Sequence, residues 1–218
     1  MLSFTEENYL KAIYKIHERT KSAASTNAIA EIMDTTAASV TDMMRKLSSK
    51  GMIHYEKYKG SRLTAEGAFV ATALIRRHRL WETFLVDKLS FSWEEVHELA
   101  EQLEHIKSDK LIEQLDQFLN FPKYDPHGDP IPNAEGKFTI REQMTLSQLA
   151  IGEKGILIGV RNHTDEFLSY LNNIKVSLGS EFIIAEKIHY DQSIKVHLGQ
   201  EEISLSEKVA NNLMIKKI

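Results

Sequence analysis

The chain has 218 residues, a net charge of −4 and 27% charged residues, which fits one large domain or two to three small ones. It contains no cysteine, and this excludes disulfides, thiolate zinc sites and thiol nucleophiles. No apolar run in the sequence approaches the length of a membrane span. The first residues carry glutamates and no basic segment, so we expect a cytoplasmic protein without a signal peptide.

The first 70 residues predict a winged helix. We expect helices over residues 5–20 (capped by Thr5), 25–33 and 39–49, with a tight polar turn at 34–37 between the last two. Residues 52–67 alternate and break at 59–61, which indicates a small β-hairpin. This region is mildly basic, with ten Lys and Arg against eight Asp and Glu.

Polar side chains of the predicted winged helix suit DNA. The turn and the helix after it offer small polar groups that can approach base edges or phosphates, and the hairpin offers cations for phosphates. The candidates are Thr36, Ser39, Thr41, Asp42, Lys57, Lys59 and Arg62. The alternative is a winged-helix module that binds protein, and the basic hairpin favours DNA.

Residues 78–105 carry histidines and carboxylates at helical spacing. Side chains three and four residues apart share one face of a helix, so these groups converge. Ser92 to Glu95 has the form of a capping box and is expected to start the second of two helices. Imidazole and carboxylate together suit manganese or iron(II). The candidate ligands are His78, Glu82, His97, Glu101, Glu104 and His105.

The competing interpretation of these helices is an ordinary solvated surface. Against it, the face that holds His97, Glu101, Glu104 and His105 has no Lys or Arg among these positions. A cation from solution would neutralise the carboxylates.

The middle of the chain predicts further helices and then a tether. Helices are expected over residues 64–88 and 108–120, with more apolar surface than a small domain needs, which favours a homodimer over core packing alone. All four prolines lie within residues 122–132, so this segment is a linker or structured tether. Asp125 and His127 lie in it as possible further ligands.

Residues 147–218 predict a small strand-rich domain, plausibly a five-stranded barrel. Short strands are expected at ILIGV, EFIIAEK and SIKVHL, and a short helix at residues 165–172. His163 and Glu166 lie between the first strand and that helix.

These segments together resemble the diphtheria toxin repressor family of metal-dependent transcriptional regulators. The resemblance rests on ENYLKAIY, SVTDMMRKL, RRHRLWETFL, VHELAEQLEHIKSD and FPKYDPHGDPIP, and it is closest to the manganese-responsive, three-domain branch. It implies a mainly α protein with a β-rich C-terminal domain. The implied parts are a winged helix-turn-helix over residues 1–70, a helical metal-binding and dimerisation domain over 71–140, and an SH3-like, FeoA-like domain over 147–218.

The resemblance also implies two metal positions per subunit. The first would use His78, Glu82 and His97, with His163 and Glu166 from the C-terminal domain. The second would use Asn8, Glu101, Glu104 and His105, and some streptococcal-type members also use the residues that match Asp125 and His127.

The chain departs from the family at three positions. Position 8 is Asn where well-known members have Met or Asp, and position 11 is Lys where small manganese sensors have Glu. Ala38, which we include in the DNA-binding set, stands where some recognition helices have Pro.

We therefore expect a homodimeric repressor, not an enzyme, that is activated by Mn²⁺ or Fe²⁺ and binds a palindromic double-stranded operator. Zn²⁺ or Co²⁺ can be expected to bind in vitro, and no membrane or small organic substrate is expected. One alternative is a di-metal carboxylate enzyme, which needs two Glu-x-x-His motifs on helices; among the predicted helices only Glu94-x-x-His97 fits. Another is a winged-helix interaction module without a metal response.

Overall fold

The computed structural model describes residues 2–139 and 141–218, and it divides the chain into two compact units. The first unit comprises residues up to 78 together with 101–109 and 132–138. The second comprises residues 79–100, 110–131 and 139–218. Each unit is described by itself.

The first unit begins with three helices, and a capping side chain precedes the first residue of each. They are α1 (Phe4–Thr20), α2 (Thr26–Ile32) and α3 (Ala37–Ser49). Ser3 and Glu6 form a capping box at α1, so Ser3 and not the expected Thr5 caps this helix. Ser25 and Thr36 cap the other two helices through their side-chain oxygens, which satisfies amide groups that a helix N-terminus leaves unpaired.

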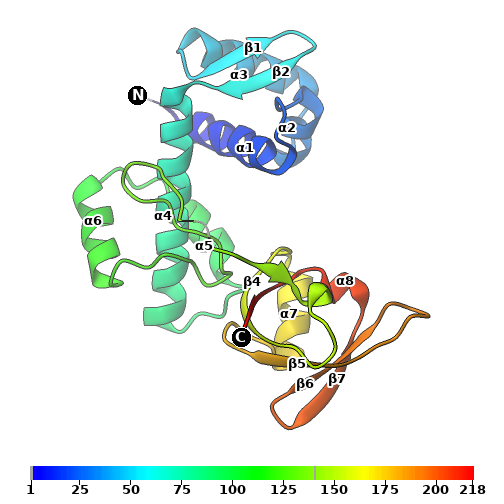
Figure 1. Cartoon of the computed structure of the whole chain (residues 1–218). Helices are drawn as coiled ribbons and strands as arrows, with labels where there is room; N and C mark the ends of the chain where they lie inside the picture. The colour runs from blue at the N-terminus through cyan, green and yellow to red at the C-terminus, as the bar shows by residue number, and fades with distance from the viewer. Residues whose placement is uncertain (1, 140) are drawn as a thin grey trace. The chain divides into compact units, whose positions relative to one another are not determined.

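A two-stranded hairpin follows the third helix. Strands β1 (Ile53–Glu56) and β2 (Gly60–Leu63) pair antiparallel, and the reversal falls beside residues 59–61 as expected. Figure 1 shows the hairpin beside α3, with α1 and α2 next to them. Buried apolar side chains of the three helices and the hairpin form one core, so the predicted winged helix is confirmed.

Three further helices carry most of the candidate ligands. They are α4 (Ala65–Leu89), α5 (Val96–Leu103) and α6 (Asp109–Phe118). Glu95 accepts from the backbone N–H and the hydroxyl of Ser92, at 3.0 and 2.6 Å. The expected capping contact therefore forms, but a turn at residues 93–95 separates it from the start of α5.

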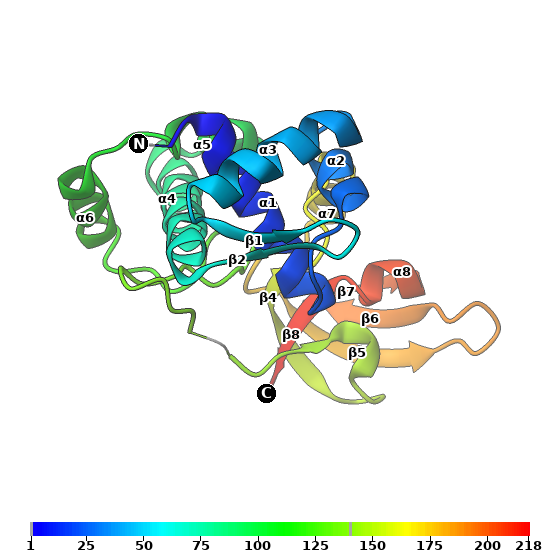
Figure 2. The same cartoon turned by 90° about the horizontal axis from the view of Figure 1, so that it is seen from above.

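The C-terminal region forms a six-stranded antiparallel sheet in the order β3-β8-β4-β5-β6-β7, where five strands were expected. Short helices accompany it, and Figure 2 shows this part of the second unit from above. The bounds are β3 (Met144–Thr145), η1 (Leu146–Gln148), β4 (Lys154–Val160), α7 (Asp165–Asn173), β5 (Glu181–Lys187), β6 (Ile194–Leu198), β7 (Glu201–Leu205), α8 (Glu207–Ala210) and β8 (Leu213–Lys217).

Two apolar cores stabilise the second unit. The larger lies between the sheet and α7 and also includes Trp93. The smaller joins Leu80 of α4 to the buried side of α6 and to Ile131. The mainly helical fold class with a β-rich C-terminal region is confirmed. Within the described residues, no helix is long and apolar enough to cross a membrane.

Candidate metal centre

Three buried side chains of the second unit converge on one point. Glu82 of α4 and Asp125 and His127 of the proline-rich tether each offer a ligand atom, and these atoms all lie within 4.8 Å of one another. Each of the three residues is at most 4% exposed. Carboxylate and imidazole at this spacing are suited to a divalent cation such as Mn²⁺ or Fe²⁺.

The tether is held in place by backbone contacts. The carbonyl of His127 accepts from the amide of Val160 at 2.9 Å, in the manner of a strand added to β4. Gly128 has φ of +88°, and a Cβ there would lie 2.2 Å from the carbonyl oxygen of Ile158. Glycine is therefore required for the tether to approach β4 this closely.

Arg79 fixes the other side of the tether to α4. Its guanidinium donates to a carboxylate oxygen of Asp129 at 2.8 Å and to the Pro130 carbonyl at 2.5 Å. Its Nε lies 3.5 Å from Oδ2 of Asp125, while Oδ1 of Asp125 accepts from the amides of His127 and Asp129. The carboxylate of Asp125 is therefore oriented before any ligand arrives.

Hydrogen bonds to carbonyl oxygens also set which histidine nitrogen is available to a metal. Nε2 of His127 lies 2.8 Å from the carbonyl oxygen of Trp93, which can only accept, so this nitrogen carries the proton. Nδ1 is then left as the lone-pair donor, and it lies 3.8 Å from Oε2 of Glu82 and 3.9 Å from Oδ1 of Asp125. Such outer hydrogen bonds commonly orient metal-binding imidazoles.

Negative charge is in excess around Glu82, Asp125 and His127 in the metal-free protein. Burial, with the neighbouring carboxylates of Glu82 and Asp129, raises the pKa of Asp125 to about 7, even though Arg79 and His127 act to lower it. A buried carboxylate pays a large desolvation cost unless a cation or hydrogen bonds compensate. A divalent cation would supply that compensation, so the residues present fit such an ion.

Two of the other ligands predicted for the first position, His97 and His163, contact members of this cluster. Nδ1 of His97 is 3.3 Å from Oε1 of Glu82. His78 lies one helical turn before Glu82 on α4, and it is the last residue of the first unit's opening segment. The ring of His163 stacks on that of His127, with centroids 5.1 Å apart. Glu166 is exposed on α7 and lines a separate pocket with Phe167 and Lys208.

The residues predicted for the second position gather in the first unit. Glu104 is 1% exposed and lies 2.6 Å from both Nζ of Lys11 and Nδ1 of His78. Nδ1 of His105 lies 2.9 Å from a carboxylate oxygen of Glu7. Burial raises the pKa of Glu104, but the hydrogen bond to His78 and the charge of Lys11 lower it by more.

The ion pair of Lys11 with Glu104 corrects the expectation that nothing neutralises these carboxylates. The cation comes from α1, which is far from α5 in the sequence, so the spacing within α5 gives no sign of it. Glu7 was missed for the same reason. Trp93 was also missed, because its contribution is a backbone carbonyl.

The residues predicted to bind DNA lie mostly at the surface of the first unit. Exposed positions include Thr36, Ala38, Ser39, Asp42, Lys57, Lys59 and Arg62, and Thr41 is half-buried. Several of the polar groups have local partners: Thr36 caps α3, Thr41 donates to the Ala37 carbonyl, and Lys59 pairs with Glu56. Arg45 of α3, which sequence reasoning missed, is a further exposed cation and pairs with Asp42 at 3.3 Å.

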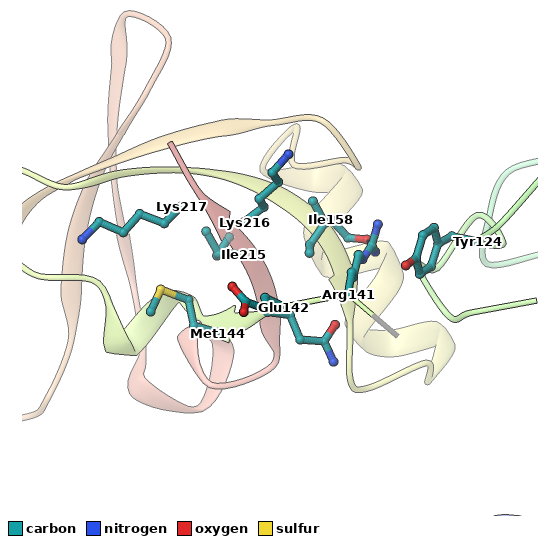
Figure 3. Close-up of a pocket in the computed structure, with 9 residues that line it drawn as sticks. Tyr124, Arg141, Glu142, Met144, Ile158, Ile215, Lys216 and Lys217 are labelled. Carbon is teal, nitrogen blue, oxygen red and sulfur yellow. The ribbon is translucent and has the colours of Figure 1, made fainter. Parts of the chain in front are cut away.

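A larger open pocket of about 940 Å³ lies on the sheet of the second unit (Figure 3). Arg141 lies over the ring of Tyr124, 3.7 Å from its centroid, and donates to the carbonyls of Gly128 and Ile158. The lining contains no histidine and one carboxylate, Glu142. The pocket therefore does not offer the ligands of a metal centre, and Arg141 serves to anchor the tether.

Comparison with known proteins decides the family. Residues 1–61 match the model of the iron-dependent repressor N-terminal DNA-binding domain. Residues 64–133 match the iron-dependent repressor metal-binding and dimerisation domain, and residues 144–217 match the FeoA domain. The chain belongs to the diphtheria toxin repressor family of metal-dependent transcriptional repressors. Members of this family are transcriptional repressors and not enzymes, so the di-metal enzyme alternative is set aside.

Solved and curated relatives agree with this assignment. A manganese-dependent transcriptional repressor in complex with manganese is 32% identical, with a TM-score of 0.86 over 98% of this chain and 100% of that one. The HTH-type transcriptional regulator MntR from Oceanobacillus iheyensis is 35% identical over 119 residues, which are 55% of this chain and 80% of that protein.

One relative is much longer than the segment that it shares with this chain. A probable metal transport system membrane protein from Chlamydia trachomatis is 43% identical over 91 residues. These residues are 42% of this chain and 20% of that protein.

Proposed function

We propose that this chain is a homodimeric repressor that binds a palindromic operator when Mn²⁺ occupies the cluster of Glu82, Asp125 and His127. Fe²⁺ is the alternative activating ion, because imidazole and carboxylate ligands also suit iron(II). The family contains regulators named for each metal.

The observation that carries the proposal is the buried cluster itself. Two carboxylates and an imidazole converge within 4.8 Å, and the tether is already fixed around them by Arg79 and by β4. Such a preorganised arrangement lowers the cost of ordering the ligands on binding. We assign the rest of the ligand set to His97, which lies beside Glu82, to His163, whose ring stacks on that of His127, and to His78 on α4; Glu166 is a further candidate.

The second metal position is part of the same proposal. We assign it to Asn8, Glu101, Glu104 and His105 in the first unit. Nδ1 of His105 faces Glu7, and its Nε2 is 3.9 Å from Oε1 of Glu104.

Each of the three segments of the chain would have its own role. Residues 1–70 would bind DNA through α3 and the hairpin, residues 71–140 would bind metal and dimerise, and residues 147–218 would support the first metal position. Metal would act by favouring the arrangement of the units that fits the operator, to the extent that it binds that arrangement more tightly.

The test is binding to promoter DNA as a function of metal. Fluorescence anisotropy with the full chain would compare Mn²⁺, anaerobic Fe²⁺, Zn²⁺ and Co²⁺ at equal free concentrations, each followed by a chelator. We expect the tightest operator binding with Mn²⁺ and release by the chelator. Binding that ignores metal altogether would instead indicate a winged-helix module without a metal response.

A further inference from the structure

The second metal position already contains a cation supplied by the chain. The Lys11 side chain is 7% exposed, and its Nζ lies 2.6 Å from Oε2 of Glu104 and 3.9 Å from Oε1 of Glu101. The same Nζ lies 3.4 Å from Nδ1 of His78. An ammonium group therefore lies among the carboxylates and the imidazole that surround this position.

A buried ammonium in this place has a clear electrostatic consequence. It offsets the charge of the buried Glu104 carboxylate, which would otherwise be costly to keep in the interior. A divalent cation near the same oxygens would be repelled by an ammonium a few ångströms away. Metal and ammonium therefore compete for the same carboxylate.

The position nevertheless retains a group that is free to bind a metal. Oδ1 of Asn8 is buried and has no hydrogen-bond partner. Buried polar oxygens are rarely left in this state. Asn8 lies three residues before Lys11 on α1, so the two side chains lie on the same side of that helix. An unpaired oxygen on the same side of α1 as the ammonium can serve as a ligand once the ammonium moves away.

We propose that Lys11 is a built-in counter-ion at the second metal position, and that a divalent cation must displace its ammonium from Glu104 in order to bind there. The long, flexible stem of lysine allows this movement without a change in the helix. The inference rests on the proposed function and deepens it. Two consequences follow: the second position fills at a higher Mn²⁺ concentration than the first, and α1 stays attached to residues 101–109 of the same unit without metal.

Two substitutions at Lys11 distinguish the effect of its charge from the effect of its side-chain shape. Lys11→Met removes the ammonium and keeps an unbranched apolar side chain, and Lys11→Arg keeps a cation. Mn²⁺ would be titrated into the full-length, DNA-free proteins while free Mn²⁺ is followed by electron paramagnetic resonance. We expect Lys11→Met to tighten the second binding step by about tenfold or more and to change the first step by much less, since Lys11 borders that position only through His78. Lys11→Arg should not tighten the second step. An unchanged or weaker second step in Lys11→Met, or no second step in any of the proteins, would overturn the inference.

The wild-type protein provides a second test if Lys11→Met does not fold. Acetylation of Lys11 by an amine-reactive reagent would be measured by mass spectrometry, with Lys175, whose side chain is 79% exposed, as the reference amine. Labelling of Lys11 should be slow without metal and several-fold faster at saturating Mn²⁺. Equal labelling in both conditions would show that the ammonium stays on Glu104.

These measurements use no DNA, so they are distinguishable from a failure of the proposed function. If operator binding follows Mn²⁺ but Lys11→Met leaves the second step unchanged, the counter-ion inference alone is wrong. If Lys11→Met tightens the second step but operator binding ignores metal, the proposed function alone is wrong.

Discussion

The carboxylate of Asp125 is buried beside that of Glu82, and its position is set by amides of the tether and by Arg79. In the metal-free protein, burial and the neighbouring carboxylates disfavour the charged form of Asp125. They raise its pKa to about 7 from the ordinary value of 3.8. An unfolded chain gives up this proton near pH 3.8 and the folded chain near pH 7. The metal-free protein therefore loses stability from this group as the pH rises between these values, and the loss is complete above pH 7.

Asp125→Asn should remove this penalty and the metal response together. The amide oxygen can still accept from the amides of His127 and Asp129, but it carries no charge. In the presence of a chelator at pH 8, we expect the variant to be more stable than the wild type by about 1–2 kcal/mol. The gain should shrink towards pH 4. Urea unfolding at both pH values measures this, and Asp87→Asn, at an exposed position near the end of α4, is the matched control. A variant that is less stable than wild type at pH 8 would contradict the assigned charge imbalance.

Sequence reasoning at the residue scale found side chains that lie at regular spacing on one helix. It identified Glu82, His97 and Glu104 from their spacing, and His127 from its place in the tether. It could not find Lys11 as the partner of Glu104 or Arg79 as the partner of Asp125, because the two members of each pair are far apart in the sequence. It also could not find the Trp93 carbonyl, because any residue type provides a carbonyl.

At the scale of single elements, the N-terminus of α1 is held by charge. Burial raises the pKa of Glu6, but hydrogen bonds from Lys50, from the backbone of Ser3 and from Lys46 lower it by more, to about 2. The two lysines come from α3 and its C-terminus, at 3.2 and 2.6 Å. Glu6 therefore joins the start of α1 to the end of the predicted recognition helix.

Glu6→Gln should weaken this connection in a pH-dependent way. A lowered folded-state pKa stabilises the protein above the unfolded value of about 4.5, and the contribution disappears as the pH falls towards 2. We expect a loss of about 1–3 kcal/mol at pH 7, and a much smaller difference from wild type at pH 3. Thermal unfolding at the two pH values measures it. An equal loss of stability at both pH values would indicate that the shape of the Glu6 side chain, and not its charge, stabilises the protein.

The hairpin offers a second test at this scale. Lys59 and Arg62 are exposed, and Lys59 is paired with Glu56 at 2.7 Å in the DNA-free protein. If both cations of each subunit contact phosphates, the dimer with Lys59→Ala and Arg62→Ala loses about four such contacts. The slope of log affinity against log salt should then fall by about four, on any DNA sequence. Lys175→Ala, which changes an exposed lysine of the second unit, should leave the slope unchanged. An unaltered slope in the double variant would remove the hairpin from the interface.

At the scale of the whole molecule, the proposed dimer needs an apolar surface. Phe118 at the end of α6 is 63% exposed, Phe121 after it is 55% exposed, and Leu111 on the same helix is 40% exposed. Exposed aromatic side chains in a cluster are typical of a surface that binds another protein. The family model that covers this region describes a dimerisation domain.

Phe118→Glu should therefore dissociate the dimer and leave each subunit folded, because the side chain is mostly exposed within one chain. Analytical ultracentrifugation should show a lower mass at micromolar concentration, and operator affinity should fall by at least about tenfold, since each subunit would then bind a half-site alone. Tyr190→Glu, at a 99% exposed position of the second unit, is the control. A variant that remains dimeric would place the interface elsewhere.

The fold of the N-terminal region was the easiest to predict, because caps, apolar periodicity and glycine signals all act locally. The C-terminal sheet was predicted less completely. Strand β7 begins with Glu201 and Glu202 and is largely polar, so its pattern resembles a loop until it pairs with β6. The division of α4 and α5 between two units was not predictable from periodicity, since both helices are continuous in sequence.

Metal control of DNA binding through Asp125 is tested most directly by the operator affinity of wild type and Asp125→Asn over one Mn²⁺ titration. Mn²⁺ should strengthen DNA binding by the wild type, and a chelator should reverse this. Asp125→Asn should require at least about tenfold more Mn²⁺ for the same effect, while its unfolding remains cooperative. Operator binding by the wild type that is equal with Mn²⁺ and with chelator, or a full Mn²⁺ response in Asp125→Asn at the wild-type concentration, would show that Mn²⁺ does not act through this carboxylate.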